Sequence, residues 1–340
     1  MSILKFAIVG CGRIAKRHAL HIQSVGVLKA VCDLDFSKAL ELALIYNAKA
    51  YRSIEDLLKS ETDLDIVSVC TPNGYHAQHA IQVMESGFHV LVEKPMALTV
   101  DECNNMITTS KKCKKELFVV KQNRFNPPVA AVKAALQNNI LGKVYSVQVN
   151  CFWNRNVDYY SDAWRGTLEL DGGTLFTQFS HFIDLLYWLF GDIKNCQAII
   201  GNFAHSGVIA FEDTGVVLLE FESGVIGSLH YSVNSYRKNM EGSITILAEK
   251  GTVKIGGQYL NELEYQSIEN FVFDQLEKGN GPNNYGTYSG SMSNHDKIYQ
   301  NLAAVILDGA TAATQASEAL KTVSIIQKIY QSAGNVKQLG

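Results

Sequence analysis

This sequence lacks an excess of either charge, since 30 Lys and Arg face 33 Asp and Glu and the net charge is -3. That balance does not favour nucleic acid or a membrane surface as a partner. The sequence also contains no internal repeat and no low-complexity tract. Its 340 residues are enough for two domains, so we expect a globular protein with two folded parts.

Paired cysteines and a leader pattern are likewise missing. The seven cysteines form no CxxC pair and lie scattered through apolar runs, which is typical of reduced thiols. We therefore expect neither a disulfide framework nor a metal site. A strand pattern follows Met1 without a basic and apolar leader, so we expect a cytoplasmic protein. The apolar run over residues 174–190 is slightly short for a bilayer span, and His181 and Asp184 interrupt it.

The first motif is a glycine-rich turn. Residues 3–9 have the pattern of a buried strand, and a helical pattern continues to about residue 24. Between them stands GxGxxA, written Gly10-Cys11-Gly12-Arg13-Ile14-Ala15. In this context the glycines permit a tight turn and close approach to a pyrophosphate, while the helix N-terminus favours the anion. The turn therefore predicts a dinucleotide site.

An acidic residue supports the same prediction. A second strand over residues 28–32 ends at Asp33, which lies 23 positions beyond Gly10. This is near the spacing expected for the acid that binds the adenosine ribose. Because a carboxylate repels a 2′-phosphate, we expect NAD rather than NADP. Two alternatives stay open: Asp33 as a loop residue or helix cap, and some tolerance of NADP through Lys38.

Strand and helix patterns alternate through the first third of the chain. Strands are predicted at 48–51, 65–70, 89–92 and 117–121, and helices at 36–46, 53–59, 77–86 and 99–115. This alternation is typical of a doubly wound parallel sheet, here a Rossmann domain over residues 1–122. Ligands in such sheets lie at the carboxyl ends of the strands, where we expect residues 71–76 and 93–95.

Lys94 stands directly after one of these strands. Pro95 restricts Lys94 to an extended backbone, which directs it out of the strand end. An ammonium group there, beside a nicotinamide, can polarise a substrate hydroxyl or take part in proton transfer. The alternative is an ordinary surface lysine.

The pattern changes after residue 122. A joint over residues 123–128 precedes a helix at 129–138, and strands with short links follow at 143–153, 216–222, 225–233, 242–248, 251–255 and 260–265. These signs predict a C-terminal α+β domain, residues 123–340, with an open and mostly antiparallel sheet. Residues 275–294 are predicted as a loop, and helices at 296–307 and 315–332 close the chain.

One helix, predicted over residues 174–190, is apolar on most faces. On a helix, Thr177, His181, Asp184 and Trp188 fall on one narrow stripe. Buried polar groups need partners, so we expect polar side chains opposite this stripe. His181 is either a core histidine held by hydrogen bonds or a catalytic one.

Four motifs together resemble the Gfo/Idh/MocA family: the turn at 10–15, Thr71-Pro72-Asn73, Glu93-Lys94-Pro95, and the glycine-rich segment that leads to His181 and Asp184. The resemblance covers nearly the whole chain. It implies that Lys94 and His181 line the pocket and face the nicotinamide and a sugar hydroxyl. Family members often carry Asp where this chain has Thr177, so Asp184 either replaces that carboxylate or anchors the helix.

A narrower likeness is to the UDP-N-acetylglucosaminuronate 3-dehydrogenases. It rests on residues 164–167, 170–173, Gln178, 239–243 and 294–297. Such enzymes oxidise the 3-hydroxyl of a UDP-linked uronic acid to a keto sugar, which an aminotransferase can then aminate for surface polysaccharide. The sequence leaves open whether NADH is reoxidised in place by a keto acid.

The resemblance and the residue chemistry together predict which residues form the site. The expected NAD contacts are Gly10, Gly12, Arg13, Ile14, Asp33, Thr71, Asn73, His76, Glu93, Lys94, Gln122, Trp164 and Arg165. The expected substrate contacts are Lys94, Asn123, Arg124, Arg155, Tyr159, Arg165, Thr177, Gln178 and His181. Each arginine can grip a carboxylate or phosphate, although a structural ion pair is an equal alternative. Tyr159, Tyr160 and Tyr285 are either stacking platforms or packed side chains.

We expect His181 to take the hydroxyl proton while Lys94 stabilises the developing alkoxide, with the reverse assignment open. Two other functions remain as alternatives: a dehydrogenase of a free cyclitol or monosaccharide, and a redox-inert sensor that binds NAD. An open sheet with one uncovered face favours a homo-oligomer, a dimer or a tetramer.

Overall fold

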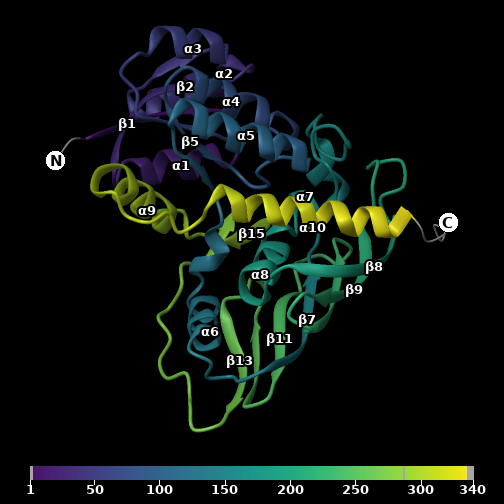
Figure 1. Cartoon of the computed structure of the whole chain (residues 1–340). Coiled ribbons are helices and arrows are strands. Elements are labelled where there is room, and N and C mark those ends of the chain that lie inside the picture. Colours follow the sequence, from purple (N-terminus) through teal and green to yellow (C-terminus); the bar gives the residue numbers. More distant parts are fainter. Residues whose placement is uncertain (1–2, 286–287, 335–340) are drawn as a thin grey trace. The chain divides into compact units, whose positions relative to one another are not determined.

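The computed structural model describes residues 3–285 and 288–334, whose contacts form two compact units (Figure 1). The first unit comprises the chain up to Lys121 together with His295–Val323, and the second comprises Gln122–Asn294 together with the chain from Ser324. The division predicted from sequence, 1–122 and 123–340, had placed residues 295–323 in the second domain. Their contacts group them with the first unit instead.

The first unit is built on a parallel sheet of six strands in the order β3-β2-β1-β4-β5-β6. The strands are β1 (Leu4–Val9), β2 (Gly26–Cys32), β3 (Lys49–Tyr51), β4 (Ile66–Val69), β5 (His89–Val92) and β6 (Leu117–Val119). This strand order is that of dinucleotide-binding sheets, in which ligands lie where the order reverses, here between β1 and β4. The predicted doubly wound fold is confirmed.

Helices cover this sheet (Figure 1). They are α1 (Ala15–Ile22), α2 (Phe36–Tyr46), α3 (Ile54–Ser60), the 3-10 turn η1 (Asn73–Tyr75), α4 (His76–Glu85), α5 (Val100–Cys113) and α9 (His295–Asp308). Side-chain caps fix several starts: Ser53 accepts from the backbone of Asp56, and Thr99 forms a capping box with Glu102. Helix α9 packs against α1, and its Tyr299 is fully buried against Phe6.

The second unit holds a sheet of seven strands in the order β13-β12-β11-β7-β10-β9-β8. The strands are β7 (Val144–Phe152), β8 (Ile193–Gly201), β9 (Thr214–Phe221), β10 (Ile226–Ser232), β11 (Glu241–Ala248), β12 (Gly251–Gly256) and β13 (Glu262–Ile268). Only the β7 and β10 pair is parallel among these neighbours, so the predicted, mostly antiparallel sheet is confirmed.

Three strands in this unit were not predicted from the sequence. One is β8, whose pattern of alternating burial is weak. The other two, β14 (Pro282–Asn284) and β15 (Ser289–Met292), form a small hairpin inside the stretch 275–294, which was wrongly predicted to be entirely loop. Short polar strands such as these carry little local signal, and pairing between them decides their conformation.

The helix predicted over residues 174–190 is broken in two. Helix α7 (Thr174–Thr177) ends at Gln178, and α8 (Ser180–Phe190) begins after Phe179. The backbone of Phe179, with φ -115° and ψ 8°, leaves the helical range and changes the direction of the chain. The end at Phe190 agrees with the predicted bound, and Gly191 after it has φ 88°.

Aromatic side chains attach α8 and the residue before it to the inner face of the second sheet. Phe179 packs on Trp153 and Tyr231, and Phe190 packs on Phe221. The remaining elements are η2 (Gln122–Phe125), α6 (Pro127–Gln137), η3 (Val157–Ser161) and α10 (Ala316–Gly334). Within residues 3–285 and 288–334, no helix has both the length and the apolarity that a membrane span requires.

Candidate active site

The turn between β1 and α1 approaches another strand closely. Gly10 has φ 91°, and a Cβ atom there would lie 2.7 Å from the carbonyl carbon and oxygen of Cys70 at the end of β4. Only glycine fits this position without displacing the backbone. A Cβ at Gly12, in contrast, would meet no atom within 4 Å, so space is open in front of the turn. Arg13 beside it is exposed and Ile14 is half-buried.

Asp33 is held at the end of β2 by this same turn. Its Oδ2 accepts a hydrogen bond from the backbone N–H of Cys11 at 2.7 Å, and its Oδ1 accepts one from Asp35 at 2.8 Å. The carboxylate therefore lies beside the glycine-rich turn. Each of its oxygens retains a lone pair for further donors.

Lys94 follows β5 and is half-buried. Its backbone N–H donates to Oε2 of Glu93 at 3.0 Å, and its peptide bond to Pro95 is cis. The side chain of Glu93 turns away from solvent, and the residue is only 6% exposed. The neighbours Lys94 and Glu93 therefore differ in their environment, although both were predicted to contact NAD.

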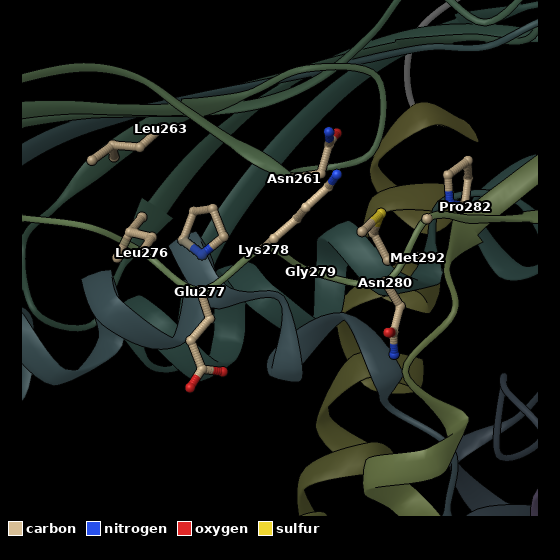
Figure 2. Close-up of a pocket in the computed structure, with 11 residues that line it drawn as sticks. Asn261, Leu263, Leu276, Glu277, Lys278, Gly279, Asn280, Pro282 and Met292 are labelled. Carbon is tan, nitrogen blue, oxygen red and sulfur yellow. The ribbon is translucent and has the colours of Figure 1, made fainter.

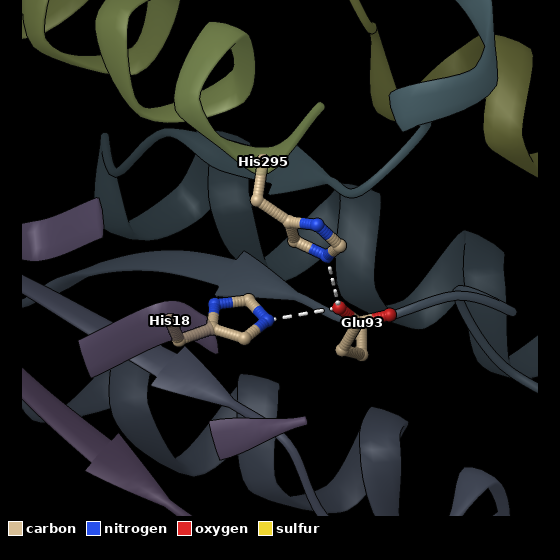
Figure 3. A group of neighbouring side chains, drawn as sticks. All are labelled: His18, Glu93 and His295. Carbon is tan, nitrogen blue, oxygen red and sulfur yellow. Dashed lines mark hydrogen bonds and ion pairs between the residues drawn. The ribbon is translucent and has the colours of Figure 1, made fainter. Parts of the chain in front are cut away.

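Two histidines bind the buried carboxylate of Glu93 (Figure 3). Oε1 lies 2.8 Å from Nε2 of His18 on α1 and 3.2 Å from Nε2 of His295 at the start of α9. Burial alone would raise the pKa of Glu93, but the hydrogen bonds from the two histidines outweigh it and hold this pKa well below its ordinary value. Burial lowers the pKa of His18, so a carboxylate accepting from a neutral imidazole is the form at neutral pH.

His76 links two strand ends. Its Nδ1 lies 2.6 Å from the carbonyl oxygen of Pro95, and its Nε2 lies 2.8 Å from that of Thr71. The residue is 1% exposed, and burial lowers its pKa. Asn73, in the same loop, is buried as well. Both ring nitrogens of His76 thus face backbone carbonyl groups, which sequence reasoning did not foresee for a residue predicted to contact NAD.

His181 is buried in the second unit, on α8. Its Nε2 lies 3.4 Å from the amide nitrogen of Gln122 and 3.3 Å from Oγ of Ser291, and Gln122 donates to Ser291 at 2.9 Å. An amide N–H is a donor only, so Nε2 of His181 is the acceptor in its contact with Gln122. Ser291 belongs to β15, so the missed hairpin also hid this neighbour of the histidine.

Asp184, one turn beyond His181, anchors the helix. Its two carboxylate oxygens accept hydrogen bonds from Nε and Nη2 of Arg124, both at 2.8 Å. Both side chains are 3% exposed, and the guanidinium of Arg124 also lies 5.2 Å from the ring centre of Trp188. The sequence alone is compatible with Asp184 either supporting His181 or anchoring the helix, and this bidentate pair supports the anchor. Asn123, next to Arg124, is 2% exposed.

Thr177 contacts a carboxylate from elsewhere in the chain. Its hydroxyl donates to Oδ1 of Asp171, whose Oδ2 accepts from the backbone N–H of Gly166 at 2.8 Å. Asp171 is 1% exposed. A buried carboxylate therefore lies next to position 177, where the resemblance noted the loss of an aspartate.

Arg155 and Arg165 share a cluster of aromatic rings. The guanidinium of Arg165 lies 4.0 Å from the ring centre of Tyr159 and 5.0 Å from that of Trp164, and that of Arg155 lies 5.1 Å from Tyr159. Tyr288 lies 4.9 Å from Arg155. Stacking on ring faces stabilises a guanidinium out of water. We name Arg155, Arg165, Tyr159 and Tyr288 the arginine–tyrosine cluster.

The hydrogen-bond partners of Arg155 within the described residues are all neutral. They are Oε1 of Gln178 at 2.7 Å, the backbone oxygen of Asn154 at 2.6 Å and Oδ1 of Asn239 at 3.2 Å. Burial lowers the pKa of Arg155, although a guanidinium stays charged at any pH of interest. Arg165, in contrast, pairs with Asp162 at 3.0 Å. The cluster thus holds a buried cation without a carboxylate among its hydrogen-bond partners.

A separate pocket of about 470 Å³ lies in the second unit beside the segment 276–282 (Figure 2). Met292 and Pro128 also line it. None of the residues that line it was predicted to contact NAD or the substrate, so we assign it no part in the reaction.

Comparisons with known proteins agree with this fold over most of the chain. Residues 4–121 match the family model described as oxidoreductase family, NAD-binding Rossmann fold, and residues 129–254 match the GFO/IDH/MocA C-terminal domain. The solved WlbA dehydrogenase of Chromobacterium violaceum, in complex with NADH and UDP-GlcNAcA, is 36% identical and covers 98% of this chain and 94% of its own, with a TM-score of 0.89. The chain belongs to the Gfo/Idh/MocA oxidoreductase family.

Two further relatives are also similar to this chain. WlbA from Bordetella pertussis, also in complex with NADH and UDP-GlcNAcA, is 33% identical over 98% of this chain and 97% of its own, with a TM-score of 0.88. D-Glucoside 3-dehydrogenase of Escherichia coli is 31% identical over 194 residues, which are 56% of this chain and 55% of that protein. The family predicted from the motifs is thereby confirmed.

The chain is an NAD-dependent oxidoreductase, as its family is. Its own residues fit the cofactor: the turn at Gly10 leaves no room for a side chain, the space at Gly12 is open, and Asp33 lies beside both. In that arrangement the N–H groups of the turn suit a pyrophosphate and Asp33 suits a ribose. The predicted contacts from Gln122, Trp164 and Arg165 belong to the second unit and stay predictions.

Proposed function

We propose that this enzyme oxidises the 3-hydroxyl of UDP-GlcNAcA, the UDP-linked N-acetylglucosaminuronic acid, to the 3-keto sugar nucleotide. The main support is the whole-chain similarity to the two WlbA dehydrogenases whose structures hold NADH and UDP-GlcNAcA. The product would supply a keto group for amination, in keeping with the synthesis of an amino sugar for surface polysaccharide.

The charges of the second unit support an anionic substrate. UDP-GlcNAcA carries a diphosphate and a carboxylate, and guanidinium groups bind both by charge-assisted hydrogen bonds. Arg155 is buried with neutral hydrogen-bond partners, and its neighbour Arg165 lies on the same tyrosine ring. A buried cation without a partner carboxylate gains free energy when an anion approaches it. A neutral monosaccharide would not need this cluster.

The two predicted catalytic residues then divide the proton chemistry. Bound NAD⁺ would supply the acceptor for the hydride from carbon 3 of the sugar. His181 takes the hydroxyl proton, which the lone pair favoured on its Nε2 permits. The ammonium of Lys94 stabilises the negative charge that develops on the oxygen.

A second candidate is a dehydrogenase of a free glucoside. It is favoured by the similarity to D-glucoside 3-dehydrogenase, which the chain matches over about half of its length. Both candidates involve the same position of a hexose ring. They differ in the group that must be bound beyond the ring.

One experiment separates these candidates. The enzyme is mixed with NAD⁺ and, in turn, UDP-GlcNAcA, UDP-N-acetylglucosamine, glucuronic acid and a methyl glucoside, and the absorbance of reduced nicotinamide is followed. We expect turnover only with UDP-GlcNAcA. Faster turnover of the methyl glucoside would support the second candidate, and no reduction with any sugar would favour an NAD-binding sensor.

The outer face of the second sheet supports a homo-oligomer. Val216 and Leu218 on β9 are exposed, and on the neighbouring strands Ile199 pairs with Val216 and Ile226 lies on the same face. Apolar residues gathered on a sheet face favour contact with a second copy of the chain. Light scattering of the purified protein measures the mass of the oligomer. We expect the mass of a dimer or tetramer for the wild type and a smaller mass for the Leu218→Lys variant.

A further inference from the structure

The carboxylate of Glu93 is fully engaged inside the first unit. Oε1 accepts from His18 and His295, and Oε2 accepts from the backbone N–H of Lys94. The residue is 6% exposed, and both histidines are 0% exposed. A carboxylate held from three directions has a fixed position, because moving it would leave several buried donors without acceptors.

The partners of Glu93 are themselves held. Nδ1 of His18 lies 2.7 Å from the hydroxyl of Tyr299, which lies 2.9 Å from Oγ of Ser68 on β4. Tyr299 is fully buried, and its ring packs edge-on against that of His18. A continuous chain of hydrogen bonds thus runs from β4 through α9 and α1 to the residue before Lys94.

The other side of Lys94 is fastened by a third histidine. His76 lies within hydrogen-bond distance of the carbonyl oxygens of Pro95 and Thr71. A neutral imidazole donates to one of them and an imidazolium to both. The backbone on each side of Lys94 is therefore fixed by buried side chains, whereas Lys94 itself is half-buried.

We infer that Glu93, His18, His295 and His76 are positioning residues that set the direction of the Lys94 side chain, and we name them the histidine bracket. Glu93 then acts through Lys94 and does not touch NAD, contrary to what the resemblance implied for it. This inference rests on the proposed function only in that Lys94 takes part in the reaction. Misplacement of a catalytic group by about 1 Å can lower a rate by about 10²-fold, so the reaction should slow when the bracket no longer holds Lys94.

The same trio has the composition of a metal site, since one ligand atom from each of His18, Glu93 and His295 lies within 4.8 Å of the others. The spacings of 2.8 and 3.2 Å from Oε1 to the two nitrogens are those of hydrogen bonds. Protons therefore fill the space between these atoms. A tightly bound metal in the purified protein, found by elemental analysis, would contradict this assignment.

The experiment measures Lys94 directly, in the full-length enzyme freed of nucleotide. An amine-reactive reagent labels the protein, and mass spectrometry compares the labelling rate of Lys94 with that of the exposed Lys59. The variants are Glu93→Gln, His295→Leu and His295→Gln. The control is Glu61→Gln, which alters a buried carboxyl that binds Lys49 and Tyr51 elsewhere in the first unit.

We expect Lys94 to label several-fold faster in Glu93→Gln and His295→Leu, because its backbone is no longer held. His295→Gln keeps an N–H donor near the carboxylate, so it should restore most of the wild-type rate. kcat should fall by about 10²-fold in the first two variants, with little change in NAD affinity. Glu61→Gln should behave as wild type in all three measurements.

Two results would overturn the inference. One is an unchanged labelling rate of Lys94 in both Glu93→Gln and His295→Leu. The other is a large loss of NAD affinity in Glu93→Gln without any change at Lys94, which would make Glu93 a cofactor ligand. Because labelling needs no substrate, a wild-type enzyme inactive on UDP-GlcNAcA would refute the proposed function while the labelling result still decides the bracket.

Discussion

The two units each contain a buried polar cluster, and the clusters are built in opposite ways. In the histidine bracket, the carboxylate of Glu93 accepts from imidazole and backbone donors. In the arginine–tyrosine cluster, the acceptors of Arg155 among the described residues are neutral oxygens, and its guanidinium lies against aromatic faces. The hydrogen bonds of the histidine bracket satisfy the carboxylate of Glu93 and fix its position. The arginine–tyrosine cluster leaves a positive charge that an anionic ligand can neutralise.

The largest effect should come from removing the working group of each unit. We expect Lys94→Met and His181→Asn each to lower kcat by roughly 10²–10⁴-fold, the range for general acid–base groups, while NAD still binds. Stopped-flow kinetics measures the rate, and titration of the protein fluorescence with NAD measures NAD binding. Full activity in either variant would remove that residue from the mechanism. If kcat of Lys94→Met, unlike that of His181→Asn, reaches the wild-type value at high pH, then Lys94 acts through its charge and is not the base.

The next effect is on stability and concerns the anchor of α8. Asp184→Asn leaves the guanidinium of Arg124 buried without its carboxylate, which should cost about 3–5 kcal/mol of unfolding free energy. Urea unfolding measures it. As a matched control, Glu220→Gln disrupts an exposed pair with Lys194, for which we expect a far smaller loss because solvent screens the pair. Equal losses in both variants would show that burial does not strengthen the Arg124 pair.

The third effect tests the charge of the arginine–tyrosine cluster. Arg155→Met keeps length and packing but removes the cation, so KM for UDP-GlcNAcA should rise by roughly 10–100-fold, the value of a charged hydrogen bond. The KM for NAD should stay unchanged. The exposed Arg237→Met is the control and should leave both constants as they are. An unchanged KM in Arg155→Met would make the arginine a structural residue.

The smallest expected effect is on the pH dependence of the free energy of unfolding. One histidine in each unit contributes to this dependence, and the two contributions should have opposite signs. Hydrogen bonds to Asp213 raise the pKa of His205, whereas burial lowers that of His18. A raised pKa stabilises the fold below the ordinary value of 6.5 and loses this contribution as the pH rises through the raised pKa. A lowered pKa costs stability as the pH falls below 6.5.

Urea unfolding between pH 5 and pH 8 (roughly the range around an ordinary histidine pKa) measures this contrast. His205→Gln should remove the loss of stability on the alkaline side, by on the order of 1 kcal/mol, as for a single hydrogen bond. His18→Gln should remove the loss on the acid side. If both variants remove the loss of stability on the same side of the pH profile, the two histidines do not act with opposite signs.

Much of the first unit was predictable because its signals are local. The boundaries of α2 and β5 were predicted to the residue, since apolar runs, caps and periodicity lie within each element. The glycine turn and Asp33 followed from spacing along the chain. In the second unit, the polar stripe that contains His181 and Asp184 was identified as buried, but its partners were not.

The sequence by itself thus determined the class of fold, the dinucleotide turn and the residues with the right chemistry, because steric and hydrophobic patterns act over a few neighbouring residues. Only the tertiary structure decided their partners. His18 and Glu93 are 75 positions apart, and Glu93 and His295 are 202 apart. The break at Phe179, the pair of Arg124 with Asp184 and the contact of Ser291 with His181 likewise depend on packing between distant segments. A buried charge takes the partner that the fold brings near, and local sequence carries no record of that choice.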